Sequence, residues 1–149
     1  MTIQEKINQE IKRCMIEKDK VSLETLRSVK SAFLIEMTKD GSSSISDSNA
    51  ESIIFRLVKQ RRESADIFAS QGRSDLAKEE LDQLKVLESY LPEQMSEEEI
   101  LDVIRDAVAE LNLSSISQIG QLMSHVMPRL KGKADGKLIS SIARTYMSR

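Results

Sequence analysis

Turn-forming and aromatic residues are scarce in this chain of 149 residues. It has 5 glycines, 2 prolines and no tryptophan, and aromatic residues make up only 3% of it. A protein built from many strands needs frequent turns, so this composition argues against such a fold. The core must come from Leu, Ile, Val, Met and Ala, several of which are good helix formers. The composition therefore favours an all-α fold.

Cysteine and long hydrophobic runs are also nearly absent. The single cysteine, Cys14, cannot form an internal disulfide, and we interpret it as a small buried side chain rather than a reactive thiol. The first residues lack the apolar centre of a signal peptide, and no window approaches the roughly 18 apolar residues of a membrane span. We therefore expect a cytoplasmic protein with no membrane contact.

Residues that carry catalysis do not form a recognisable group. His125 is the only histidine, which excludes a His-rich metal site and a Cys–His nucleophile pair. The stretch "GKADGK" looks like a phosphate loop, but its glycines are one residue too close and Leu138 stands where Ser or Thr is required. The sequence therefore predicts no cofactor, no metal and no active site.

Hydrophobic periodicity and capping residues predict seven helices. They cover about residues 2–18, 19–39, 47–71, 74–91, 96–111, 115–128 and 136–149, with suitable N-caps at Thr2, Asp19, Ser74, Ser96 and Asp135. In the first helix, Ile3, Ile7, Ile11 and Met15 recur every four residues and are expected to form one buried stripe. The sixth helix is expected to end where it meets Pro128.

The stretch "YLPEQMSEEEIL" is the strongest boundary. Pro92 disfavours helix at the preceding residue, and Ser96 begins a new helix whose first turn is acidic. We therefore predict an N-terminal four-helix part over residues 1–92. A C-terminal three-helix part is predicted over residues 96–149 and contains the basic turn "KGKADG".

Charge is unevenly distributed, although the net charge is only −2. Residues 1–73 carry a small positive excess, residues 74–112 contain 12 acidic and 3 basic residues, and residues 113–149 contain 1 acidic and 6 basic residues. A basic end predicts an anionic partner, whereas pairing between the basic and acidic zones predicts a purely internal role. The sequence leaves both alternatives open.

Two basic clusters are candidates for contacts with nucleic acid. The first is the turn, with Arg129, Lys131, Lys133 and Lys137; its alternative is a solvated loop. The second is the stretch "RLVKQRRES", with Lys59, Arg61 and Arg62. Arg61 lies on the edge of the apolar stripe of its helix, so it either pairs with a carboxylate or is placed for recognition.

Several of these stretches resemble one known family. "LRSVKSA", "LVKQRRES", "LKVLESYLPEQMSEEEI" and "IGQLMSHVMPRLKGKADGKLI" closely resemble the YqeY family, across almost the whole chain. That family is similar to the C-terminal tail of the B subunit of the tRNA-dependent amidotransferase. The resemblance implies an all-helical fold in two parts and a link to tRNA.

The resemblance also limits the function. The tail helps the amidotransferase to hold tRNA, whereas catalysis takes place in other domains, so a label of glutamine-dependent carbon–nitrogen ligase follows from homology only. We expect a non-catalytic accessory protein that binds tRNA or a tRNA-containing complex through the lysines of the turn. The alternatives are a protein-interaction adaptor that uses its helical faces, including "QLMSHVM", and an amidotransferase component acting in trans.

Overall fold

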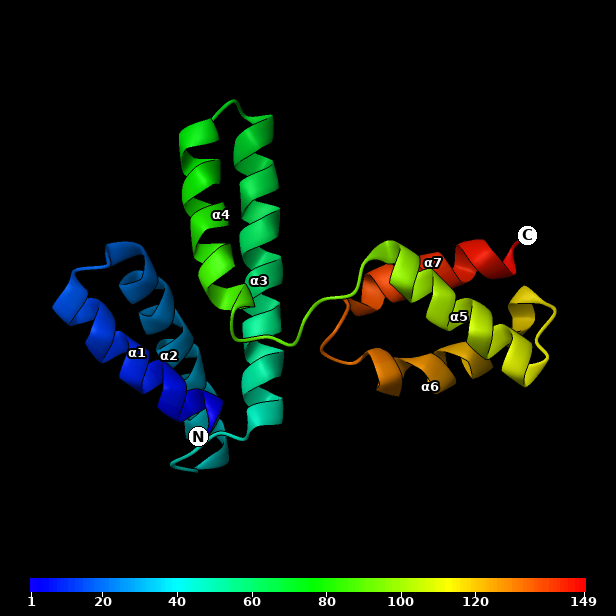
Figure 1. The fold of residues 1–149 in the computed structure, drawn as a ribbon, viewed down its shortest axis with the longest axis horizontal. Coiled ribbons are helices and arrows are strands. Elements are labelled where there is room, and N and C mark those ends of the chain that lie inside the picture. Colours follow the sequence, from blue (N-terminus) through cyan, green and yellow to red (C-terminus); the bar gives the residue numbers. More distant parts are fainter. The chain divides into compact units, whose positions relative to one another are not determined.

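The protein is all-helical, as the sequence predicts. A computed structural model describes residues 1–149 and contains seven α-helices, a short 3-10 turn and no strand (Figure 1). No helix is both long enough and apolar enough to cross a membrane. The α-helices are α1 (Ile3–Glu17), α2 (Lys20–Asp40), α3 (Asp47–Ser70), α4 (Ser74–Glu88), α5 (Glu97–Leu111), α6 (Ile119–Leu130) and α7 (Gly136–Met147), and the 3-10 turn is η1 (Ile116–Gln118).

The chain divides into two compact units, each with its own hydrophobic core. Unit 1, Met1–Leu91, contains α1 to α4, and unit 2, Pro92–Arg149, contains η1 and α5 to α7. The largest fully buried side chains of unit 1 include Phe33, Leu26 and Ile54. Those of unit 2 include Ile104, Leu122 and Ile139.

Local capping explains where most helices begin. Thr2 and Glu5 form a complete capping box at α1, and the side chains of Asp19, Ser46 and Ser96 cap α2, α3 and α5. The predicted cap Ser74 is wrong, because it is the first residue of α4. The N-cap there is Arg73, which makes no side-chain capping hydrogen bond. Side-chain caps therefore account for most, but not all, of the points at which the helices begin.

The buried stripe of α1 differs from the predicted one at its last position. Ile3, Ile7 and Ile11 are buried, but Met15 is 49% exposed and Cys14 is buried in its place. The reason is helix geometry: each step of four residues rotates about 40° beyond a full turn, so a strict four-residue repeat leaves the buried face. The interpretation of Cys14 as a small buried side chain is confirmed, and burial raises the pKa of its thiol.

The α3–α4 pair is the most extensive helix packing of unit 1, and the two helices lie side by side in Figure 1.

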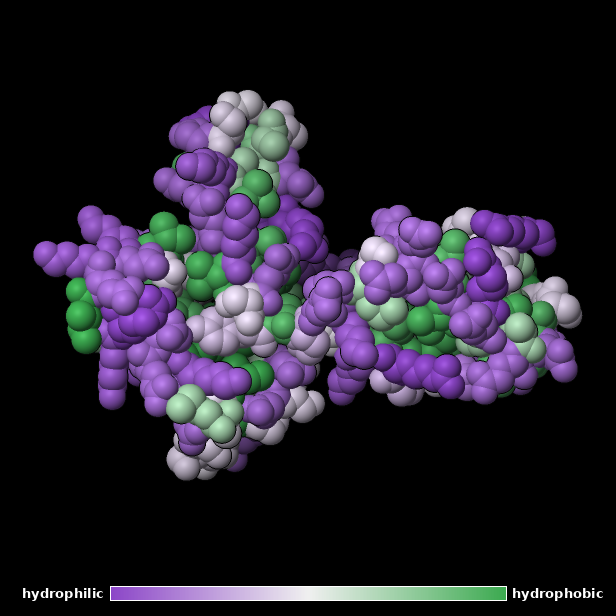
Figure 2. Space-filling view, viewed as in Figure 1, coloured by the Kyte–Doolittle hydropathy of each residue, from purple (hydrophilic) through white to green (hydrophobic).

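Hydrophilic residues cover most of the visible surface in Figure 2. Hydrophobic side chains are nevertheless exposed around the turn between α1 and α2, namely Met15, Ile16 and Val21. Tyr90, at the end of unit 1, is half-buried, and burial raises its pKa to about 12.

In unit 2, α6 does not end at Pro128 as predicted. It continues to Leu130, two residues beyond Pro128, although this proline has no N–H to bond to the carbonyl of Ser124. Leu130 is 1% exposed and secures that last turn against the core. The end of α6 is thus determined by burial of Leu130 and not by the proline.

Candidate nucleic-acid interface

The seven basic residues selected from the sequence fall into two groups. Arg129, Lys131, Lys133 and Lys137 lie at the α6–α7 connection in unit 2, whereas Lys59, Arg61 and Arg62 lie on α3 in unit 1. We name residues 131–135, "KGKAD", the basic turn. The two groups have different surroundings, and we describe each separately.

The basic turn has exposed lysines between two buried residues, Leu130 before it and Ala134 near its end. Leu130 and Ala134, 1% and 8% exposed, hold its two ends in the core, while Lys131 and Lys133 are exposed. The N–H groups of Lys133 and Ala134 donate to the carbonyl of Leu130, at 2.9 and 3.2 Å. Gly132 has φ +79°, a left-handed conformation that favours glycine. The lysine side chains are therefore directed outward from a defined backbone.

The segment before α5 is hydrogen-bonded to this turn. Nε2 of Gln94 donates to the carbonyl of Gly132 at 2.8 Å, and the N–H of Met95 donates to the carbonyl of Lys133 at 2.9 Å. The same Nε2 also donates to the carbonyl of Pro92 at 3.0 Å. The stretches "PEQM" and "KGKADG", far apart in the sequence, therefore form one structural element of unit 2.

The last part of this element is the start of α7. The carboxylate of Asp135 accepts from the N–H of Lys137 at 3.5 Å, so Asp135 is the N-cap, as predicted. Lys137 is exposed in the first turn. Lys131, Lys133 and Lys137 form no ion pair in the structure, so their ammonium groups are available to an anionic partner.

Arg129, unlike the three lysines, lies close to a carboxylate. Its Nη2 lies 3.8 Å from Oε2 of Glu110 on α5, and the side chain is 52% exposed. The same Oε2 lies 3.4 Å from Nε2 of His125, a buried atom that makes no hydrogen bond there. Glu110 thus pairs with Arg129 and lies beside His125, so part of the negative charge of residues 74–112 is compensated within unit 2.

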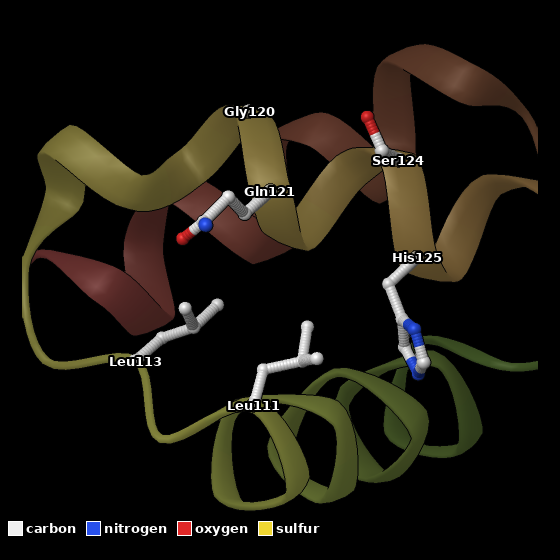
Figure 3. Close-up of a pocket in the computed structure, with 6 residues that line it drawn as sticks. All are labelled: Leu111, Leu113, Gly120, Gln121, Ser124 and His125. Carbon is white, nitrogen blue, oxygen red and sulfur yellow. The ribbon is translucent and has the colours of Figure 1, made fainter.

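An open hollow of about 720 Å³ lies beside His125, between the end of α5 and α6. Figure 3 shows the side chains of Leu111, Leu113, Gln121 and His125 directed toward it. Met123 and Met127, from the stretch "QLMSHVM", are partly buried and pack against the core of unit 2. The apolar residues of that stretch therefore mainly stabilise α6.

Two arginines of α3, Arg61 and Arg62, pair with acidic residues of α4. Nη1 of Arg61 lies 3.1 Å from Oε2 of Glu80, with side chains 28% and 19% exposed, and Nη2 of Arg62 lies 3.0 Å from Oε1 of Glu88. Lys59 is half-buried. Of the two alternatives left open by the sequence, pairing with a carboxylate is the one that the structure favours for Arg61.

We expect the pair between Arg61 and Glu80 to stabilise unit 1. The substitution Glu80→Gln keeps the size of the side chain but removes its charge, and should lower the free energy of unfolding by about 1 kcal/mol. Urea denaturation measures this change. The opposite result, unchanged stability for Glu80→Gln together with weaker tRNA binding by Arg61→Gln, would assign Arg61 to recognition instead.

Sequence reasoning missed Gln94 and Met95. Neither is charged, and Met95 fits only a hydrophobic staple with Ile100 at the start of α5, so no local pattern linked either residue to the basic turn. The only available indication was that the stretches containing "PEQM" and "KGKADG" both resemble the same family. Their contact follows from the packing of unit 2 and not from their spacing in the chain.

Comparisons with known proteins agree with that resemblance. A family described as Yqey-like protein matches residues 4–147, nearly the whole chain. The chain is also 30% identical, over 138 residues, to a protein of Pyrenophora tritici-repentis (strain Pt-1C-BFP) named "Altered inheritance of mitochondria protein 41, mitochondrial". The matched region covers 91% of this chain and 75% of that protein.

Proposed function

This chain belongs to the YqeY family, and we propose that it is a non-catalytic accessory protein that binds tRNA, or a tRNA-containing complex, through its basic turn and the adjacent Lys137. The observation that carries the proposal is the exposure of three lysines without ion-pair partners on a hydrogen-bonded backbone. The resemblance to the tRNA-holding tail of the amidotransferase supports the choice of tRNA. We expect the protein to act in the cytoplasm. The similar protein from Pyrenophora is named mitochondrial.

The chemistry of the basic turn fits the RNA backbone better than the bases. Lysine ammonium groups are compact charges that contact phosphates without reading sequence. Only 3% of the chain is aromatic, and no aromatic side chain lies in the turn on which an unpaired base could stack. We therefore expect recognition of helical RNA by shape and backbone charge.

The carboxylates near the basic turn limit the expected affinity. Met95, which contacts Lys133, is followed closely by the acidic first turn of α5, with Glu97, Glu98 and Glu99. These carboxylates repel the phosphates of RNA. We therefore expect binding to depend on a few well-placed lysine contacts, and the affinity to fall strongly as the salt concentration rises. Arg61 and Arg62 are expected to contribute little, because they already pair with α4.

A titration of the full chain against an unmodified tRNA transcript tests the proposal. With about four phosphate contacts, the affinity should fall about 100-fold between about 50 mM and about 200 mM salt, since each contact contributes about −0.9 to the slope of log K against log salt. Absence of binding at the lower salt concentration would refute the proposal.

A protein-interaction adaptor is the second candidate function. The exposed side chains of Met15, Ile16 and Val21 favour it, because a cluster of apolar residues on the surface is a common feature of protein-binding sites. This alternative predicts partners whose recovery is insensitive to nuclease. An amidotransferase component acting in trans would instead change glutamine-dependent amidation when added to that enzyme.

A further inference from the structure

We infer that Gln94 is a positioning residue, which holds the basic turn in the shape that presents its lysines; the inference rests on the proposed function. Gln94 is an exposed side chain, so packing in the core does not explain its placement. Its Nε2 nevertheless donates to the carbonyls of both Gly132 and Pro92, at 2.8 and 3.0 Å. One amide group thereby ties the first residue of unit 2 to the centre of the basic turn.

The basic turn needs such a restraint. It contains Gly132 in a left-handed conformation, and a glycine-containing turn has many accessible backbone conformations when nothing holds it. Within the turn itself, the N–H groups of Lys133 and Ala134 bond to Leu130, but the carbonyls of Gly132 and Lys133 accept no hydrogen bond from the backbone of the turn. Those two carbonyls receive their hydrogen bonds from Gln94 and Met95. The restraint on the lysine-bearing residues is therefore supplied from outside the turn.

Glutamine has the chemistry that this place requires. Its neutral NH₂ group has two N–H donors, which is the number that two carbonyl acceptors need. A glutamate would place carboxylate oxygens, which repel, against the two carbonyl oxygens. An alanine would have no donor, so the carbonyl of Gly132 could bond only to water. A restrained turn loses less conformational entropy when it meets phosphates, so Gln94 raises the affinity without touching the RNA.

Positioning and direct contact have different salt dependences. A lysine that contacts phosphate contributes about −0.9 to the slope of log K against log salt, so Lys133→Gln should reduce the steepness by about that amount. Gln94→Ala removes no charge. It should lower the affinity by about tenfold, the effect of one or two net hydrogen bonds, with the slope unchanged. Gln121→Ala, an exposed glutamine of α6 in the same unit, is the matched control and should bind like the parent.

The restraint can also be measured without RNA. Backbone ¹⁵N relaxation of the free protein should show residues 131–135 as ordered in the parent, with order parameters near about 0.85, and below about 0.6 in Gln94→Ala and Gln94→Glu. The amide of Met95 should be protected from hydrogen exchange in the parent, since it donates to Lys133. Protection of the Met95 amide is measured in the parent alone, so it tests whether this segment holds the basic turn even if a Gln94 variant folds poorly.

The two proposals fail in distinguishable ways. If the parent does not bind tRNA, the proposed function is wrong, whereas order in residues 131–135 that is lost on Gln94→Ala still supports the restraint. If the parent binds tRNA but Gln94→Ala binds equally well, or changes the salt slope as a lysine variant does, the inference is wrong. An unprotected Met95 amide, or a turn that is equally ordered in Gln94→Ala, also overturns it.

Discussion

Replacing Lys131, Lys133 and Lys137 together with glutamate is expected to abolish tRNA binding and to leave the helix content unchanged. The substitutions turn three positive charges into three negative ones at the proposed contact, and the affinity at about 50 mM salt should fall by more than about 100-fold. All three side chains are exposed and form no ion pair, so the fold does not depend on them. Titration against tRNA and far-ultraviolet circular dichroism measure the two effects.

A second triple variant controls for net charge. Lys6, Lys12 and Lys30 are exposed residues of α1 and α2 in unit 1, and their replacement by glutamate changes the net charge by the same amount. This control should weaken tRNA binding only slightly. Equal losses in the two variants would mean that binding follows net charge and not the basic turn, and unchanged binding in the first variant would contradict the proposed interface.

The second large effect concerns the two cores. Ile104 is fully buried in unit 2, and Ile104→Ala should lower the free energy of unfolding of that unit by about 2–5 kcal/mol. Ile54→Ala should do the same in unit 1, where Ile54 is also fully buried. Because the buried residues form separate clusters, each substitution should destabilise mainly its own unit. Urea denaturation followed through residue-specific amide signals would distinguish the two units.

An exposed isoleucine is the control for the core variants. Ile35 is 61% exposed on α2, so Ile35→Ala should change the stability by no more than about 0.5 kcal/mol. If Ile104→Ala and Ile54→Ala each lowered the stability of both units equally, the chain would unfold as one cooperative whole. If the proposed function is right, partial unfolding of unit 2 by Ile104→Ala should also weaken tRNA binding, because the anchors Leu130 and Ala134 lie in its core.

Local patterns were sufficient for the class of fold and for the exposure of the lysines in the basic turn. Scarce turn residues and a helical hydrophobic period predicted an all-α chain, and Thr2, Asp19, Ser96 and Asp135 cap helices as expected. These features depend on residues within one helical turn of each other, so the sequence contains all the information that they need. The same holds for Lys131 and Lys133, whose exposure follows from a polar turn between two amphipathic helices.

Two errors have different causes, one in the assumed helical period and one in packing. Met15 continues a four-residue repeat, yet the rotation of the helix puts Cys14 on the buried face instead. Pro128 disfavours helix in isolation, but burial of Leu130 extends α6 beyond it. At α6, the free energy of burying Leu130 against the core exceeds the local preference against helix at the proline. At α1, the strict four-residue repeat was the wrong period for a helix of 3.6 residues per turn.

The sequence alone was enough to determine the helices, their capped beginnings and the basic composition of the turn, because these depend on neighbouring residues. It did not show that Arg61 pairs with Glu80, or that Gln94 and Met95 hold Gly132 and Lys133. Each of these contacts joins two segments of the chain, and a hydrogen bond forms only where donor and acceptor lie within about 3 Å. Packing of the helices, and no pattern along the chain, brings those atoms together.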